Sequence, residues 1–107
     1  MARNIGTANF PSGTGAKALN IGMTATWMQL VFSGSGIKNS TGWIENSDQY
    51  CIPAEGDSAV NKAIRVKNTS GTVVYEGTWT SFSGNNVNFN ITTNTLGTPA
   101  VLLIFGN

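Results

Sequence analysis

The chain has 107 residues, and its six Lys and Arg nearly balance its five Asp and Glu, which gives a formal net charge of +1. This length corresponds to one domain with one hydrophobic core, and a chain with only 10% charged residues has no long-range field to attract nucleic acid or an anionic membrane. The sequence has no His and a single Cys51, which excludes an intrachain disulfide, a Cys/His zinc site and a His-activated nucleophile. We therefore expect no metal, no other cofactor and no enzymatic activity.

The N-terminal segment carries no targeting signal that the sequence reveals. MARNIGTANF lacks the apolar core of a signal peptide, and no apolar run approaches the ~20 residues that span a bilayer. We expect a protein that is made soluble in a cytoplasm. Residues 1–17 end in the Gly-rich NFPSGTGAK and lack a period-two pattern, so we expect them to form an irregular N-terminal arm.

Period-two alternation dominates the rest of the chain. Apolar residues alternate with polar ones at 19–23, 60–66 and 87–91, which predicts strands with one buried face. NTSG at 68–71 is typical of a turn, and TVVYEGTW then returns the chain as a hairpin. No segment indicates a helix. We predict an all-β fold: a single small antiparallel β-sandwich, jelly-roll-like, of about seven to eight strands.

Two segments, 27–32 (WMQLVF) and 100–105 (AVLLIF), are apolar on both faces. Successive side chains of a strand point to opposite sides of its sheet, so such strands need cover on both sides. If the two strands are neighbours, the outer face of their sheet is an apolar patch, and large exposed patches usually mark an interface. The candidate oligomer-interface residues are Trp27, Val31, Leu102 and Ile104.

This patch predicts a homo-oligomer, and we favour a trimer. The alternative is that the irregular segment 1–17, or the long stretch 33–58, folds over the same face within one subunit. The 33–58 stretch has no clear secondary structure in its pattern, and loops of that length in compact domains are usually functional or partly structured. It also holds four of the five acidic residues, which are Glu45, Asp48, Glu55 and Asp57.

Several functions compete for this acidic stretch. A sugar site would stack Trp43 or Tyr50 on a pyranose and use Asp48 and Asn46 for its hydroxyls. A glycosidase would need two carboxylates in a cleft, and a calcium site would need a ligand spacing that this segment lacks. The structural alternative is a strand or pinned loop with solvated acids, and its buried side would be Trp43, Ile44, Tyr50, Cys51 and Ile52. The candidate partner or glycan contacts are Trp43, Glu45, Asp48 and Tyr50.

Three basic side chains lie on the predicted outward face of the 60–66 strand and its continuation. They are Lys62, Arg65 and Lys67. Without interleaved aromatic residues they do not make a nucleic-acid surface. We expect them to pair with the acidic stretch of a neighbouring copy.

The succession ALNIGMTATWMQLVF, AIRVKNTSGTVVYEGTWTSFSGNNVNFNIT and terminal VLLIFGN resembles small β-sandwich modules of tailed bacteriophage virions. The resemblance covers residues 18–107 and implies a structural role in the virion. It implies either a capsid decoration (cement) protein, bound to the major capsid protein or another virion protein, or a receptor-binding tail-fibre tip. The absence of shaft repeats favours the decoration subunit. The alternative is a carbohydrate-binding module of a tail fibre, or a trimeric lectin-like protein.

Overall fold

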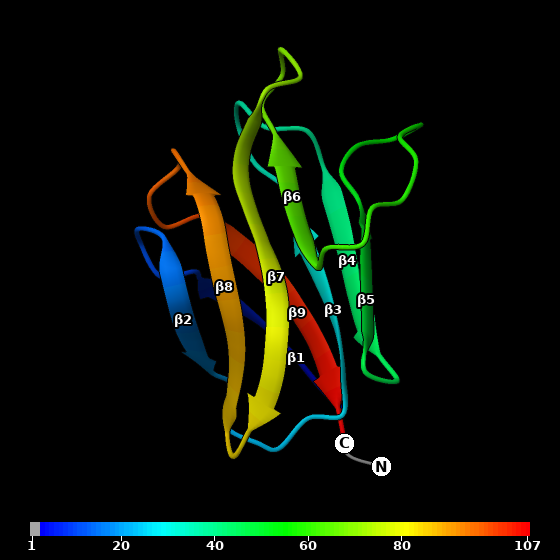
Figure 1. The fold of residues 1–107 in the computed structure, drawn as a ribbon, viewed down its shortest axis with the longest axis vertical. Helices are drawn as coiled ribbons and strands as arrows, with labels where there is room; N and C mark the ends of the chain where they lie inside the picture. The colour runs from blue at the N-terminus through cyan, green and yellow to red at the C-terminus, as the bar shows by residue number, and fades with distance from the viewer. Residues whose placement is uncertain (1–2) are drawn as a thin grey trace.

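A computed structural model describes residues 3–107, which form nine strands and no helix (Figure 1). The strands make two antiparallel sheets with the orders β1-β9-β3-β4-β5 and β2-β8-β7-β6, stacked as a sandwich. The prediction of a small all-β sandwich is confirmed, with nine strands instead of seven to eight. Their bounds are β1 (Arg3–Asn9), β2 (Gly15–Asn20), β3 (Trp27–Phe32), β4 (Ser40–Glu45), β5 (Asp48–Ile52), β6 (Ile64–Lys67), β7 (Val73–Ser83), β8 (Asn86–Asn94) and β9 (Ala100–Gly106).

The topology resembles a jelly roll only at the two ends of the chain. β1 pairs with β9 in one sheet and β2 pairs with β8 in the other, as in the outermost ribbon of a jelly roll. Two meanders of consecutive strands, β3-β4-β5 and β6-β7-β8, complete the sheets, and β8 belongs both to the second meander and to the β2–β8 pair. A jelly roll would instead combine two Greek keys. The jelly-roll-like topology that the sequence predicted is therefore present in the β1–β9 and β2–β8 pairs.

The core lies between the sheets and is centred on aromatic side chains. Phe10 follows β1, and its ring centroid lies 5.6 Å from that of Phe32 and 5.2 Å from that of Phe89. Tyr75 packs on the same cluster and is fully buried. The alternation predicted at 87–91 is confirmed, because Val87, Phe89 and Ile91 all face the core.

The first predicted strand is misplaced. Alternation of Leu19, Ile21 and Met23 predicted a strand at 19–23, whereas β2 ends at Asn20. Ile21 lies just beyond the strand, where it is still buried and its amide donates to the carbonyl of Asn85 at 2.8 Å. An apolar residue that covers the end of the core therefore extended the apparent pattern.

The prediction of an irregular arm at residues 1–17 is wrong for residues 3–17, and residues 1–2 lie outside the described part of the chain. β1 pairs with β9 without interruption from Arg3↔Gly106 to Asn9↔Ala100, and β2 starts at Gly15. The core-facing positions of β1 hold small or polar residues such as Gly6 and Ala8, so the segment lacks a hydrophobic period. Pairing with β9, more than burial of β1 side chains, defines this strand.

The 33–58 stretch, whose pattern showed no clear secondary structure, is partly structured and contains a hairpin. β4 and β5 pair from Thr41↔Ile52 to Glu45↔Asp48. Asn46 and Ser47 connect them with φ of 52° and 61°, the left-handed pair that a type I′ hairpin turn requires. The hairpin extends the five-stranded sheet edgewise beside β3 (Figure 1) and does not fold over it.

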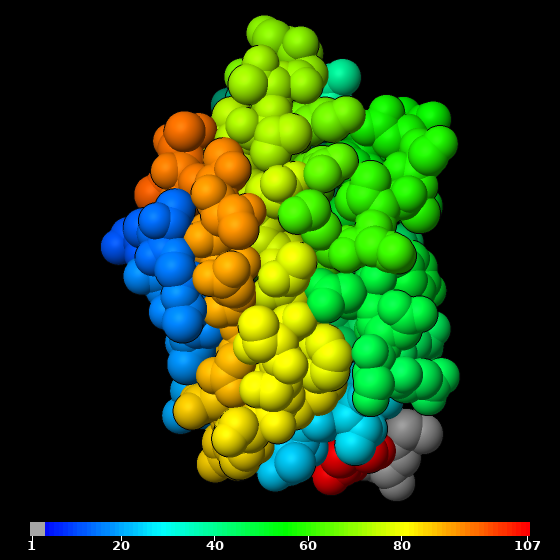
Figure 2. All heavy atoms as spheres, in the orientation of Figure 1, coloured from blue at the N-terminus to red at the C-terminus, as the bar shows by residue number. Residues whose placement is uncertain are grey.

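The outer face of the four-stranded sheet is polar. The side chains that alternate with the buried residues of β8 are Asn88, Asn90 and Thr92, and the neighbouring β2 presents Ala16 and Ala18. Figure 2 views this side of the molecule, where β2, β8 and β7 lie side by side. This sheet thus shows the usual pattern of one core face and one solvated face.

Candidate functional site

The outer face of the five-stranded sheet is apolar, in contrast to the other sheet. β3 and β9 are direct neighbours, with Val31 opposite Leu102 and Gln29 opposite Ile104. β1 adds Ile5 opposite Ile104. We call the patch the outer face, and its apolar members are Ile5, Trp27, Val31, Trp43, Tyr50, Ile52, Leu102 and Ile104.

These side chains are partly or largely open to solvent. Ile5 is 61% exposed, and Ile52 and Leu102 are each 36% exposed. A shallow hollow of 150 Å³ lies near Thr7, Val31 and Leu102. The candidates to cover this face were segments 1–17 and 33–58, and their strands β1, β4 and β5 instead pair edgewise within this sheet. The cover within one subunit that the sequence left open is therefore not supplied by these segments.

The four predicted interface residues all belong to this one face. Trp27 and Val31 come from β3, and Leu102 and Ile104 come from β9. The structure brings them together because both strands alternate in phase, with Met28, Leu30 and Phe32 and their β9 counterparts turned to the core. Ile5 was missed, since it lies in a segment without a hydrophobic period.

The predicted glycan contacts lie on the same face, at the β4–β5 edge. Trp43 is directly opposite Tyr50, and their rings stack with centroids 5.1 Å apart and an interplanar angle of 21°. Glu45 is opposite Asp48 at the turn end of the hairpin, and both carboxylates are exposed. The Tyr50 hydroxyl donates to Glu45 Oε1 at 3.5 Å. An aromatic pair is thus flanked by two carboxylates.

The structural alternative, in which the apolar residues of the 43–52 stretch form one buried side, is correct for only two of these residues. Ile44 and Cys51 face the core and are 1% and 0% exposed. Trp43, Tyr50 and Ile52 alternate with them and point outward. The hairpin therefore contributes both core residues and outer-face residues.

Gln49 is a structural residue that the sequence did not single out. It lies between Asp48 and Tyr50 and faces the other sheet, where its Nε2 donates to the carbonyl of Trp79 at 2.8 Å. Its Oε1 accepts from the amides of Trp79 and Ala63 at 2.8 and 3.0 Å. Only its place on the core side of an alternating strand could have indicated this role.

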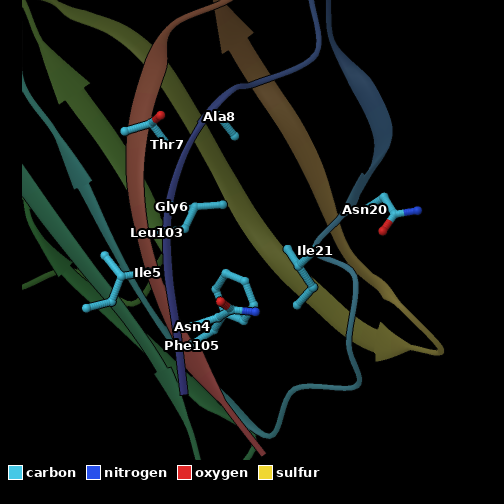
Figure 3. A pocket seen from close by; sticks show the side chains of 9 residues that line it. All are labelled: Asn4, Ile5, Gly6, Thr7, Ala8, Asn20, Ile21, Leu103 and Phe105. Carbon is cyan, nitrogen blue, oxygen red and sulfur yellow. The ribbon is translucent and has the colours of Figure 1, made fainter. Parts of the chain in front are cut away.

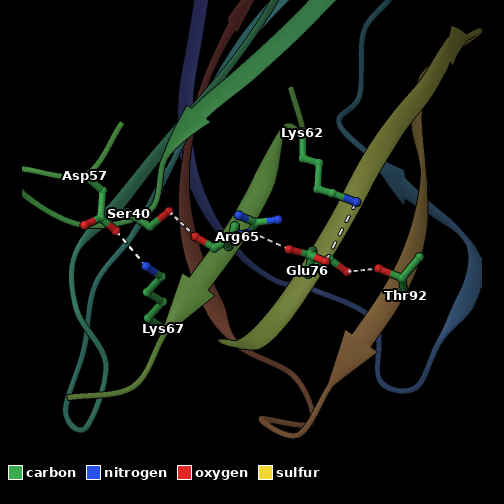
Figure 4. A network of polar contacts seen from close by, with 7 residues as sticks. All are labelled: Ser40, Asp57, Lys62, Arg65, Lys67, Glu76 and Thr92. Carbon is green, nitrogen blue, oxygen red and sulfur yellow. Dashed lines mark hydrogen bonds and ion pairs between the residues drawn. The ribbon is translucent and has the colours of Figure 1, made fainter. Parts of the chain in front are cut away.

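The three basic residues on and just before β6 form ion pairs within the chain, whereas we expected them to pair with the acidic stretch of a neighbouring copy. Arg65 donates to Glu76, which lies opposite it on β7, and Lys62 Nζ lies 3.8 Å from the same carboxylate (Figure 4). Lys67 Nζ donates to Asp57 Oδ2 at 2.8 Å, and this hydrogen bond lowers the pKa of Asp57. The network ties the 53–59 segment to the four-stranded sheet.

Burial determines the reactivity of Cys51, the single cysteine of the sequence. Cys51 is fully buried, and desolvation raises the pKa of its thiol to about 11. Because the thiolate is the reactive species, such a cysteine is structural. Across residues 3–107, no three His, Cys, Asp or Glu side chains gather in a way that could hold a metal ion. In the same part of the chain there is no helix long and apolar enough to cross a membrane.

No protein-family model, curated protein or solved structure matches the chain. The arguments for function therefore come from the outer face itself. Chemically, it offers a broad apolar surface with aromatic side chains at one edge and two carboxylates at its end, which suits binding by burial of apolar area.

Proposed function

We propose that the protein is a non-enzymatic structural subunit of a bacteriophage virion, a capsid decoration protein that works as a homo-oligomer. The observation that carries the structural role is the apolar outer face of the five-stranded sheet. A small two-layer sandwich normally presents its outer faces to water, and a contiguous apolar patch on one of them favours a protein interface. The virion as the place of action is supported by the sequence resemblance.

The composition of the outer face suits a stable coat. Its central side chains, from β9 and β3, are aliphatic or aromatic except for Gln29, and Glu45 and Asp48 lie at its margin. Apolar contacts depend little on ionic strength, because few ion pairs are present to be screened. We therefore expect attachment and self-association to persist when salt is raised.

Substitution on the outer face tests the homo-oligomer. Leu102→Lys or Ile104→Lys places a charge in the proposed contact and is expected to convert the assembly to an 11.3 kDa monomer in native mass spectrometry at micromolar concentration. Asn88→Lys is the matched control on the polar outer face of the other sheet and is expected to leave the assembly intact. A wild-type protein that is monomeric at this concentration would contradict self-association.

The virion role needs a test of its own. Purified particles of the phage that encodes the chain are expected to contain it in many copies, measured by quantitative mass spectrometry. Particles that lack it are expected to lose heat resistance, and added protein is expected to restore it. Absence of the chain from the particles would refute the decoration role without bearing on self-association.

A second candidate function is glycan binding at the β4–β5 edge. It is favoured by the partly exposed, stacked Trp43 and Tyr50 with exposed Asp48 beside them, since aromatic faces and carboxylates suit sugar rings and hydroxyls. This function predicts saturable binding of a defined oligosaccharide on a glycan array. Tyr50→Ala and Asp48→Asn should each abolish binding with little change in melting temperature. In a decoration subunit, Asp48→Asn should be nearly silent, because an exposed charge contributes about 0–1 kcal/mol.

A further inference from the structure

Within residues 3–107, no strand pairs with the outer edge of β1. The amide of Phe10 donates to the carbonyl of Pro99 at 2.9 Å, which makes that pair hydrogen-bonded. Hydrogen-bonded and non-hydrogen-bonded pairs alternate in an antiparallel ladder. The backbone N–H and C=O groups of Ile5, Thr7 and Asn9 therefore point away from β9, at the edge of the five-stranded sheet.

Each of the other three sheet edges is partly covered or blocked. Val60 forms two backbone hydrogen bonds with Cys51 and covers β5 at that residue, and β6 accepts from the Lys38 amide at its Lys67 carbonyl and from the Ser40 hydroxyl at its Arg65 carbonyl. β2 carries Lys17 on its core-facing side, opposite Phe89, and an inward-pointing charge on an edge strand is a common device against pairing. β1 has neither Pro nor Lys, and its register with β9 has no bulge.

A hollow of 240 Å³ lies directly beneath this open edge, between β1 and the end of β2 (Figure 3). Its floor consists of Ile21, Leu103 and Phe105. β1 leaves it unfilled because its core-facing residues there include Gly6, where an added Cβ would meet no atom within 4 Å. Ile5 and Thr7 point to the opposite side of the strand. The sandwich thus lacks one apolar side chain at this margin.

We propose that β1 binds an extended segment of another protein by strand addition, with a bulky apolar side chain of that segment inserted into the hollow. The new strand would pair with the outward groups of Ile5, Thr7 and Asn9 and make a six-stranded sheet. Every second side chain would face the hollow, where no ionisable side chain is among the lining residues. A Leu, Ile or Phe at the position beside Gly6 fits this environment, and a charged residue does not.

A second copy of β1 does not supply this side chain. In a symmetric antiparallel pair centred on Thr7, the residues facing the hollow from the partner are Gly6 and Ala8 of that copy, and a pair centred on Ile5 places Asn4 and Gly6 there. All are small or polar, so the hollow would stay empty. The occupant is therefore a different segment, and the site is separate from the outer face proposed for self-association.

Synthetic peptides of the form acetyl-Lys-Thr-Thr-Xaa-Thr-Thr-Lys-amide are suitable probes, read by NMR titration of the intact chain. With Leu or Phe as the central residue, we expect binding at least ten-fold tighter than with Gly or Asp. We also expect the amide signals of Ile5, Thr7 and Asn9 to shift and their hydrogen exchange to slow. Equal binding of the Leu and Asp peptides, or none at millimolar peptide, would overturn the proposal.

Two substitutions and a matched control locate the site. Thr7→Pro removes an outward N–H from β1 and should weaken Leu-peptide binding at least ten-fold. Ala18→Pro removes an outward N–H from the β2 edge and should leave binding unchanged. Should Thr7→Pro fail to fold, Gly6→Val fills the hollow and should cause the same loss in a folded chain.

Two further results separate this proposal from the others. Leu102→Lys, on the outer face, should leave peptide binding unchanged, so failure of strand addition and failure of the proposed assembly are distinguishable. A wild-type dimer that Thr7→Pro dissociates would assign the edge to a second copy and overturn the proposal.

Discussion

Gln49 is a neutral side chain that joins the two sheets where an apolar contact would be expected. Its amide group can donate and accept at once, and it uses both capacities: it donates to the Trp79 carbonyl and accepts from the Trp79 and Ala63 amides. The ladder between β7 and β8 shifts register between Trp79 and Ser81. Gln49 therefore serves backbone groups at an irregular point of the four-stranded sheet.

Replacement of Gln49 by Leu is expected to be costly because it leaves three backbone groups without their partner. At ~1–3 kcal/mol for each unsatisfied buried group, the free energy of unfolding should fall by about 3 kcal/mol or more, measured by urea denaturation. Gln29→Leu is the control, since Gln29 lies on the outer face beside Trp43, and it should change stability by about 0.5 kcal/mol or less. Equal losses at the two positions would contradict the bridging role.

Two buried acids make the protein sensitive to alkaline pH. Burial raises the pKa of Cys51 to about 11 and that of Tyr75 to about 12. Between the ordinary pKa values of 9.0 and 10.0 and these raised values, the unfolded chain loses protons that the folded chain keeps, so stability falls as pH rises. Cys51→Ala should flatten part of this decline in melting temperature between pH 9 and pH 11. An unchanged slope would contradict the assignment to Cys51.

At the scale of the element, the sequence predicts a strand well where one face is bulky and the other polar. β3 and β9, which are apolar on both faces, were predicted almost to their ends. β8 meets the condition and was predicted at 87–91, inside its bounds of Asn86–Asn94. β4 does not, because its core side carries Ser40, Gly42 and Ile44 while Trp43 points outward. The core side is small because the backbone around Ala63 packs directly on it. The largest apolar side chain of β4 therefore lies on its outer side and small residues lie on its core side, so the local sequence pattern alone could not reveal the hairpin.

The two glycines that face the core from β4 and β1 should respond in opposite ways to an added methyl group. At Gly42 a Cβ would lie 1.9 Å from the Ala63 carbonyl oxygen, so Gly42→Ala must displace backbone and is expected to cost about 3 kcal/mol or more. At Gly6 the space is open, so Gly6→Ala should be neutral or slightly stabilising. Thermal denaturation of both variants tests this, and similar melting temperatures would show that the sheets can readily move apart at Gly42.

At the scale of the whole molecule, the candidate site was predictable where it depended on alternation. Trp27, Val31, Leu102 and Ile104 could be assigned to one face from two strands apolar on both sides, given that the strands are neighbours. That Ile5 and the Trp43–Tyr50 pair belong to the same face could not be predicted, because this depends on which strands occupy the sheet edges. That order is set by pairing between segments far apart in the chain.

The pairing of β1 with β9 also has a consequence for folding. Arg3 lies opposite Gly106, so this ladder closes nearly the whole chain into a loop, and contacts of such sequence separation slow folding. We expect a circular permutant, with residues 107 and 1 joined by a short Gly/Ser linker and new ends at the exposed turn between Ser70 and Gly71, to refold faster in stopped-flow experiments. Its unfolding rate should change less, provided that β1 and β9 already pair in the transition state for folding. A permutant that refolds no faster would mean that the two ends of the chain meet after the rate-limiting step, and that the meanders β3-β5 and β6-β8 set the speed at which this sandwich forms.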